Sequence, residues 1–404
     1  MNFYDYYGEG FDKEFLKNRL ERLLNAFRSN EGVDADFLFS SPGRAEILGN
    51  HTDHNHGLVL VSAISCDILA AVKKTDGNKI KICSEGYSPI IVDLSDTQIK
   101  QAEKGTSTAL ARGVANALIN RGFVLGGFTA YLTSSVFKGA GVSSSAAFEV
   151  LVAEIFNSLY LDGVLSAVDK AVVSQYAENE YFGKPCGLLD QSGIAIGSLS
   201  KLDFKEPLRP SISKYSMPKG YTLVITNTGG DHASLTSHYA AIRSEMESVA
   251  KVFGKQVLRE VEEEEFYSNI KTVREKTSDR AVLRAMHFYE ENKRVLSAVS
   301  ALENGDSKGF LQAVNESGLS SLIRLQNCCV PNEVSQPVIT GIEVSRSIIK
   351  DGAVRVHGGG FAGSILAIVN ENERENYCKK MSEIFGEENV FTAHVRPTGT
   401  AKMV

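Results

Sequence analysis

The residues whose chemistry is most concentrated lie in SPGRAEILGNHTDHNHGLVLV, residues 41–61. The imidazole and carboxylate groups of His51, Asp53, His54 and His56 could bind a metal ion, or they could exchange hydrogen bonds with the hydroxyl groups of a sugar. The His-x-x-His spacing differs from the i,i+4 pair that places two zinc ligands on one helix face. A metal site, a sugar site and a solvated turn therefore all remain open from these residues alone.

A second stretch, GAGVSSSAA at residues 139–147, joins glycines to serines. Glycine lets the backbone approach a ligand closely, and the free N–H groups at a helix start attract a phosphate. The serine hydroxyls could add hydrogen bonds or bind Mg²⁺. The stretch is not a Walker loop, because no G-K-[ST] follows it. In the alternative interpretation, Ser143 only caps the helix.

Three consecutive glycines in VHGGGFAGS, residues 356–364, indicate a tight turn or close backbone approach between two strands. A hydrolase loop of the H-G-G-G type would need a downstream G-x-S-x-G nucleophile, which the sequence lacks. Arg44 follows a Pro-Gly turn and could neutralise phosphoryl charge, or it could be an ordinary surface charge. Asp190 is a lone acid in the small and apolar run CGLLDQSG, and it could be a helix cap or a catalytic group.

The elements that must position these groups belong to a chain of 404 residues, which is long enough for two domains. The hydrophobic fraction of 43% and the charged fraction of 23% are typical of a globular protein. A net charge of −6 without a basic stretch indicates neither a nucleic-acid partner nor a membrane surface. The N-terminus lacks a signal-peptide pattern, and the six cysteines form no C-x-x-C pair. We therefore expect a cytoplasmic protein. We also expect a monomer that acts on small molecules.

The hydrophobic pattern predicts an α+β fold rather than a doubly wound sheet. Apolar residues recur at helical spacing in residues 11–29, and the β-like runs after the histidine-rich turn predict an antiparallel meander. A helix is predicted at 107–122, and a longer one begins at the serine cluster. The proline-rich residues 204–220 predict either an interdomain connection or a surface loop.

Three motifs, PGRAEILGNHTDHNHG, GAGVSSSAA and VHGGGFAGS, occur in the order typical of the GHMP family of small-molecule kinases. The first motif resembles the galactokinase signature, and so do AENEYFGKPCGLLDQ at 177–191 and VITNTGGDHASLTSHYAAIR at 224–243. The resemblance implies a two-domain α+β fold with the active site in the cleft between the domains. The N-terminal domain, 1–205, would be of the ribosomal protein S5 domain 2 type, and the C-terminal domain, 206–404, would be ferredoxin-like.

The resemblance also implies a reaction, the ATP-dependent phosphorylation of the anomeric hydroxyl of galactose with Mg²⁺ as cofactor. Asp190 would accept the proton of that hydroxyl or only orient it, and Arg44 would stabilise the transferring phosphoryl group. The nucleotide would bind Gly139, Ala140, Gly141, Val142, Ser143, Ser144, Ser145 and Ala146. The sugar would contact Asn50, His51, Asp53, Gly187, Asp190 and Tyr239. The metal ligands would be Ser145 and Glu178.

One part of the first motif departs from the family pattern. Galactokinases usually have a glutamate and a tyrosine where this chain has Asn50 and His54. Asparagine keeps an acceptor, loses the charge and adds two donors. A neutral group there would tolerate negative charge at C6, so a kinase for galacturonate or N-acetylgalactosamine is the alternative prediction. A sugar sensor without catalysis is a further alternative, which the intact Arg44, Asp190 and serine cluster argue against.

Overall fold

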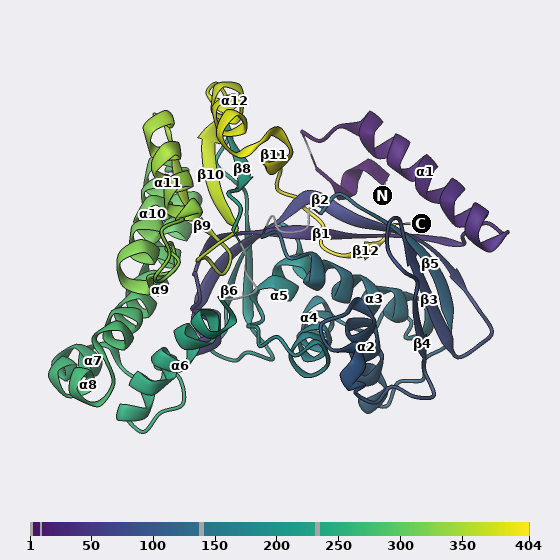
Figure 1. Ribbon diagram of the computed structural model, residues 1–404, viewed down its shortest axis with the longest axis horizontal. Coiled ribbons are helices and arrows are strands. Elements are labelled where there is room, and N and C mark those ends of the chain that lie inside the picture. Colours follow the sequence, from purple (N-terminus) through teal and green to yellow (C-terminus); the bar gives the residue numbers. More distant parts are fainter. Residues whose placement is uncertain (1–2, 9, 137–140, 231–234, 404) are drawn as a thin grey trace.

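The computed structural model describes residues 3–8, 10–136, 141–230 and 235–403. In this part of the chain the strands form two sheets, and helices pack around both (Figure 1). The arrangement is α+β, as the sequence predicts.

The larger sheet has the strand order β12-β1-β2-β5-β3-β4, with β6 paired to β2 and β7 paired to β6. Its strands are β1 (Phe37–Leu48), β2 (Leu58–Lys74), β3 (Lys79–Ser84), β4 (Ile90–Asp93), β5 (Phe128–Ser134), β6 (Leu199–Asp203), β7 (Ser211–Tyr215) and β12 (Ala401–Lys402). The predicted meander is wrong, because β2 is one strand of 17 residues and β3 pairs in parallel with β5. No glycine or proline interrupts residues 58–74, so nothing breaks the strand where its partner changes from β6 to β5.

The proline-rich segment 204–220 contributes a strand, since β7 pairs antiparallel with β6 before the chain enters the smaller sheet. It is therefore more than a connecting loop. The domain boundary at residue 205 stays a prediction, and two strands beyond it, β7 and β12, belong to the larger sheet.

Residues near both ends of the described chain converge on the larger sheet. Strand β12 pairs with β1, the strand that begins the first motif. Buried Asp67 on β2 forms ion pairs with Arg19 of α1 at 2.8 Å and with Arg396 at 3.4 Å, and Tyr7 donates its hydroxyl to the same carboxylate. Two arginines and a tyrosine thus fasten the N- and C-terminal segments to the centre of this sheet.

Helices cover both faces of the larger sheet. In Figure 1, α1 lies above the sheet and α2 to α5 lie below it. Their bounds are α1 (Lys13–Glu31), α2 (Ser107–Asn120), α3 (Ser144–Tyr160), α4 (Ala167–Tyr176) and α5 (Leu189–Ile196). The predicted helix start at the serine cluster is confirmed, because α3 begins at Ser144. The helix predicted at 107–122 is also found, and it ends two residues before Gly122.

The smaller sheet has the order β11-β8-β10-β9, and all its pairs are antiparallel. Its strands are β8 (Tyr221–Asn227), β9 (Gly352–His357), β10 (Ser364–Asn370) and β11 (Val390–Ala393). Side chains alternate between its faces. Leu223, Ile225, Leu366 and Ile368 join the same buried cluster as the larger sheet, whereas Val224, Ile365 and Ala367 pack with residues of α11 and α12. The glycine turn predicted between two strands lies between β9 and β10.

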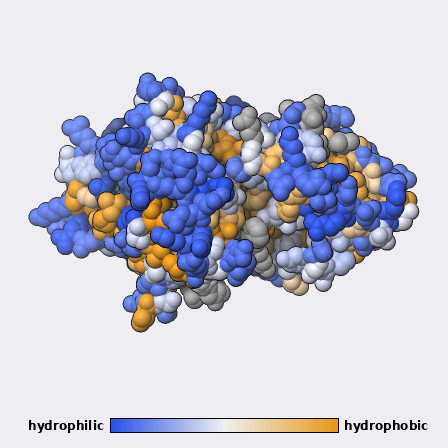
Figure 2. Space-filling model, turned by 90° about the horizontal axis from the view of Figure 1, so that it is seen from above, coloured by the Kyte–Doolittle hydropathy of each residue, from blue (hydrophilic) through white to orange (hydrophobic). Residues whose placement is uncertain are grey.

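The remaining helices all follow β8 in the chain, and the last three of them pack against the smaller sheet. They are α6 (Thr236–Val252), α7 (Glu263–Ser268), α8 (Ile270–Lys276), α9 (Asp279–Glu303), α10 (Ser307–Ser320), α11 (Pro337–Ile348) and α12 (Arg374–Phe385). None of the helices in the described ranges is long and apolar enough to cross a membrane. The face of the molecule in Figure 2 is mainly hydrophilic, with apolar side chains scattered among polar ones.

Candidate active site

The best-defined polar cluster joins β1, α3 and α5 around one ion pair. Arg44 donates from Nε to Oδ1 of Asp190 at 2.7 Å and from Nη2 to Oδ2 at 2.9 Å. Ser143 donates its hydroxyl to the same carboxylate. The third Arg44 nitrogen, Nη1, donates to the carbonyl oxygen of Gly141. The arginine of the first motif and the lone acid of the run CGLLDQSG therefore meet at the glycine-serine stretch.

The backbone of that stretch turns sharply into α3. Gly141 has a φ of 69° and Ser143 a φ of 60°, both in the left-handed region. The N–H of Arg44 donates to the carbonyl oxygen of Val142 at 3.2 Å, which fixes the turn against β1. The Ser143 side chain makes no capping hydrogen bond to α3, so the capping interpretation of this serine is wrong.

The nucleotide-binding prediction falls mostly on this turn. Ser144, Ser145 and Ala146 form the first turn of α3, where backbone N–H groups without intrahelical partners can bind a phosphate. Gly139 and Ala140 lie outside the described residues. The nucleotide contacts themselves stay predictions.

Asp190 is held as an ionised carboxylate. Burial raises the pKa of this group, but the Arg44 guanidinium and the Ser143 hydroxyl outweigh burial, and the pKa lies below its ordinary value of 3.8. An ionised carboxylate can accept a hydrogen bond from a substrate hydroxyl, and the bidentate arginine fixes its orientation. Because a carboxylate with a low pKa is a weak base, proton acceptance and simple orientation remain separate predictions for Asp190.

The two predicted metal ligands are in contact with each other, Ser145 from the first turn of α3 and Glu178 from a separate short helix. Ser145 donates its hydroxyl to Oε1 of Glu178 at 3.1 Å, and Gln191 donates to Oε2 of Glu178 at 2.8 Å. Glu178 belongs to the short π-helix η4 (Ala177–Phe182) and is 3% exposed. Glu149 is also buried here, and one of its oxygens, Oε1, has no partner among the described residues. Burial, followed by the neighbouring Glu178, raises the pKa of Glu149 well above 4.5.

These groups suit Mg²⁺ better than a transition metal. The described residues contain no group of three or more His, Cys, Asp or Glu side chains that could hold a metal ion. Mg²⁺ commonly uses one or two protein carboxylates and fills its other positions with phosphate oxygens and water. The Glu178 carboxylate and the Ser145 hydroxyl fit that ligand set, and the zinc interpretation of the histidine-rich turn gains no third ligand from the described residues.

Two predicted sugar contacts lie beside α5. Asp53 accepts the backbone N–H of Leu189 at 3.2 Å, so its carboxylate lies at the start of the helix that carries Asp190. A Cβ atom at Gly187 would overlap the Asp53 carboxylate, which explains why glycine occupies this position. The first motif and the segment 177–191 are therefore in direct contact.

Two further predicted sugar contacts pack against the third motif. His51 has a φ of 58°, and its Nε2 lies 2.9 Å from the carbonyl oxygen of Gly359. Burial, followed by the charge of neighbouring His54, lowers the pKa of His51 to about 4, so the ring is neutral at physiological pH. Tyr239 on α6 donates its hydroxyl to the carbonyl oxygen of Gly360 at 2.8 Å. The three sequence motifs are thus assembled around one region.

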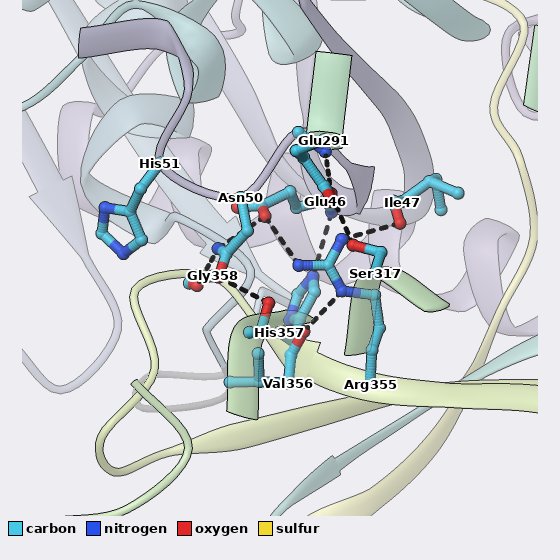
Figure 3. A network of polar contacts seen from close by, with 12 residues as sticks. Glu46, Ile47, Asn50, His51, Glu291, Ser317, Arg355, Val356, His357 and Gly358 are labelled. Atoms are coloured by element: carbon cyan, nitrogen blue, oxygen red, sulfur yellow. Dashed lines mark hydrogen bonds and ion pairs between the residues drawn. The ribbon is translucent and has the colours of Figure 1, made fainter. Parts of the chain in front are cut away.

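Asn50 lies in a buried network next to His51, another predicted sugar contact (Figure 3). Its side chain is 1% exposed, and its Nδ2 donates to Glu46 at 2.7 Å and to the Gly358 carbonyl oxygen at 2.8 Å. Its Oδ1 accepts from Asn327 at 2.8 Å. Arg355 of β9 completes the network with an ion pair to Glu46 at 3.2 Å. These contacts use the polar atoms of Asn50 within the protein, and its contact with a sugar stays a prediction.

Sequence reasoning missed the residues of α9 that support the histidine-rich turn. His287 approaches the carbonyl oxygen of Asn50 through Nε2 at 2.9 Å, and Glu291 accepts the backbone N–H of Gly49 at 2.9 Å. Both side chains are fully buried. Their spacing of four residues, which places two polar groups on one helix face in a partly apolar segment, was the available signal.

We expect Asn50→Asp to destabilise the protein more than Asn50→Ala at about pH 8. The aspartate places a second carboxylate against Glu46, and a buried charge without a partner costs about 3 kcal/mol of the free energy of unfolding. Alanine loses hydrogen bonds without adding charge, at about 1–3 kcal/mol. Burial raises the pKa of Glu46 to about 7, so Glu46 takes up a proton below that pH and the aspartate penalty shrinks.

Urea denaturation of the wild type and both Asn50 variants at about pH 8 and pH 5.5 measures this difference. An aspartate variant that is as stable as the alanine variant at the higher pH would contradict the proposed contact with an ionised Glu46.

Comparisons with known proteins match two segments of the sequence and the overall fold. The family model described as the galactokinase galactose-binding signature matches residues 25–74, and that of the GHMP kinases N terminal domain matches residues 109–198. Arg44, His51 and Asp53 lie within the first match, and Ser143 and Asp190 lie within the second.

Solved structures of several kinases share the fold of this chain. Lactococcus lactis galactokinase complexed with galactose superposes with a TM-score of 0.83 at 24% identity, over 95% of this chain and 99% of that chain. Methanococcus jannaschii mevalonate kinase superposes with a TM-score of 0.63 at 14% identity, over 89% of this chain and 98% of that chain. Streptococcus pneumoniae phosphomevalonate kinase in complex with phosphomevalonate and AMPPNP superposes with a TM-score of 0.59 at 14% identity, over 88% of this chain and 97% of that chain. At these identities the likeness establishes the fold.

Proposed function

We propose, from the premise that this chain is a GHMP kinase that carries the galactokinase signature, that it phosphorylates galactose at the anomeric hydroxyl. ATP donates its γ-phosphoryl group, and the products are galactose 1-phosphate and ADP. The observation that carries the proposal is the convergence of Arg44, Ser143 and Asp190, which links the galactose-binding signature to the helix start of the GHMP domain.

In the proposed reaction the sugar hydroxyl attacks the γ-phosphorus of ATP. The bond from O1 to the γ-phosphorus forms, the bond from the γ-phosphorus to the β,γ-bridging oxygen breaks, and ADP leaves. Asp190 accepts a hydrogen bond from the hydroxyl and directs its lone pair at phosphorus, with the proton passing to the carboxylate or to water. Arg44, already bonded to Asp190 and Gly141, supplies positive charge beside the transferring group.

We further propose that Mg²⁺ accompanies the nucleotide. Glu178 and Ser145 would hold the ion, which when bound would neutralise phosphate charge. The unpartnered oxygen of Glu149 is available to accept from a water of its hydration shell. The chain's own contribution is to keep these oxygens together at the first turn of α3.

The buried network favours galactose over a sugar acid. Position 50 lacks the acidic side chain that is usual in galactokinases. An acid nevertheless lies beside it, since Oε1 of Glu46 is 2.7 Å from Nδ2 of Asn50. Arg355 of this network already pairs with Glu46, so a C6 carboxylate placed here would meet another carboxyl group without a cation of its own, which is unfavourable in a buried site. The galacturonate alternative is therefore the weaker substrate proposal.

We expect galactose to give the highest kcat/KM in a panel of galactose, galacturonate, N-acetylgalactosamine, arabinose and mevalonate. ADP release measured with each compound ranks them. A higher kcat/KM for another member would overturn the proposed substrate while leaving the kinase assignment intact. If a sugar of the panel binds but none of the compounds leads to ADP release, a sensor would be favoured. We also propose that the protein acts as a monomer in the cytoplasm.

A further inference from the structure

Two buried side chains, which the proposed mechanism does not use, face the glycine-serine turn from the smaller sheet. His357 ends β9 and Ser364 begins β10, and the two residues are cross-strand partners. Their side chains are 2% and 1% exposed. A Cβ atom at Gly141 would lie 3.2 Å from Ser364 Oγ and 3.3 Å from His357 Nδ1. Both polar atoms therefore point at the left-handed glycine of the turn.

The hydrogen bonds of His357 fix its tautomer. The backbone N–H of Glu46 donates to His357 Nε2 at 3.2 Å, so Nε2 carries a lone pair (Figure 3). Burial, followed by the charges of Arg44 and Arg355, lowers the pKa of His357 well below 6.5, and the ring is neutral. Its single ring proton must then be on Nδ1. His357 consequently presents an N–H donor to Gly141, next to the hydroxyl of Ser364.

Neither donor has a partner in the described part of the chain. Two carbonyl groups of the turn accept from Arg44 instead, Gly141 from the side chain and Val142 from the backbone N–H. Buried donors without acceptors are unfavourable and rare in folded proteins. A pair of them beside an arginine, at a turn suited to phosphate, indicates an acceptor that is supplied by a ligand.

We infer that His357 Nδ1–H and the Ser364 hydroxyl form a neutral donor pair for a phosphate oxygen of the bound nucleotide beside Gly141. This inference rests on the proposed function and adds residues from the third motif to the nucleotide site. Neutral donors suit the position, because a further cation would repel Arg44, whereas an N–H and an O–H stabilise negative charge without adding any.

Two substitutions of His357 distinguish the roles of its two ring nitrogen atoms. The amide of His357→Asn reaches the Nδ1 position and keeps the donor, whereas the amide oxygen of His357→Gln reaches the Nε2 position and keeps the acceptor for the Glu46 N–H. We expect the glutamine variant to bind ADP and the ATP analogue AMPPNP about tenfold more weakly at nearly unchanged melting temperature. We expect the asparagine variant to keep wild-type affinity at a lower melting temperature.

Isothermal titration calorimetry measures the nucleotide affinities, and thermal unfolding measures the melting temperatures. Ser364→Ala tests the second donor, and we expect it to lose affinity to the same extent as the glutamine variant. Nucleotide binding is measured without sugar, so a wild type that binds ADP but fails to phosphorylate galactose would refute the proposed function alone. Equal affinities for the glutamine variant and the wild type, or equal losses in both His357 variants, would overturn the inference.

A measurement on the wild type covers the case in which a variant fails to fold. With ¹⁵N-labelled histidine, the Nδ1–H resonance of His357, one of eight histidines, is expected to shift when ADP is added. An unchanged resonance at saturating ADP would overturn the inference as well.

Discussion

Replacement of Asp190 by asparagine is expected to lower kcat for galactose phosphorylation by about a thousandfold, within the range for loss of a general base. Asparagine keeps the size of the side chain and one acceptor oxygen for Ser143 and Arg44, so the surrounding turn should stay in place. ADP affinity is expected to remain within about twofold of the wild type, because the proposed phosphate contacts are at the start of α3. ADP release and calorimetry measure the two quantities.

A second substitution separates the two roles proposed for Asp190. If the carboxylate only orients the hydroxyl, asparagine should retain more activity than alanine, whose side chain offers no oxygen. If the carboxylate accepts the proton, both variants should lose activity to a similar extent. An asparagine variant with more than about a tenth of wild-type kcat would remove Asp190 from the chemical step.

The substitution Arg44→Lys is expected to lower kcat by about a hundredfold or more, the effect typical of losing a preorganised donor to developing charge. Lysine keeps the positive charge but cannot bond both Asp190 oxygens and the Gly141 carbonyl oxygen at once. Arg346→Lys is a matched control, since Arg346 pairs with Glu343 on α11 away from the turn, and its activity should be unchanged.

The pH profile of the Arg44→Lys variant provides an independent readout. Burial raises the pKa of Asp190, whereas Arg44 is the main group that lowers it. Weakening that contact must raise the pKa, and activity requires the ionised carboxylate. The acidic limb of the profile of kcat/KM against pH should therefore move to higher pH. A limb that stays in place while kcat falls would show that Arg44 does not control the ionisation of Asp190.

Short sequence motifs predicted the residues that lie together in the site. Arg44, the serine cluster and Asp190 each belong to a local pattern of glycine, serine or acid that is visible within a few residues, whereas Glu178 is identified only through the resemblance to the GHMP kinases. Such patterns also predicted the start of α3 and the turn between β9 and β10. Their roles in binding and catalysis rest on the experiments described above.

The buried environment of Asn50 could not be predicted in this way. Its distant partners include Asn327 and Gly358, and the contact between Asn327 and Asn50 spans 277 positions. No local periodicity encodes which distant side chain fills a buried hydrogen-bonding position. The tautomer of His357 is hidden for the same reason, since it depends on a backbone N–H that is 311 positions away.

The long strand β2 was also misjudged from sequence. The sequence pattern of its two apolar halves predicts separate strands. In the structure each half does have its own partner on one side, β6 for residues 58–62 and β5 for residues 68–74. The pairing with β1 runs along nearly its whole length and requires the segment to be continuous. Local composition reports burial, but it does not report which strands lie alongside.

The pairing of β12 with β1 has a consequence for biosynthesis. Strand β1 carries Arg44, yet Phe39 and Ser40 face Lys402 and Ala401 across the sheet. A ribosome must therefore release residues beyond position 400 before this edge is covered. Until then a nascent chain exposes an unpaired edge of the strand that carries Arg44, a state open to chaperone capture or to aggregation.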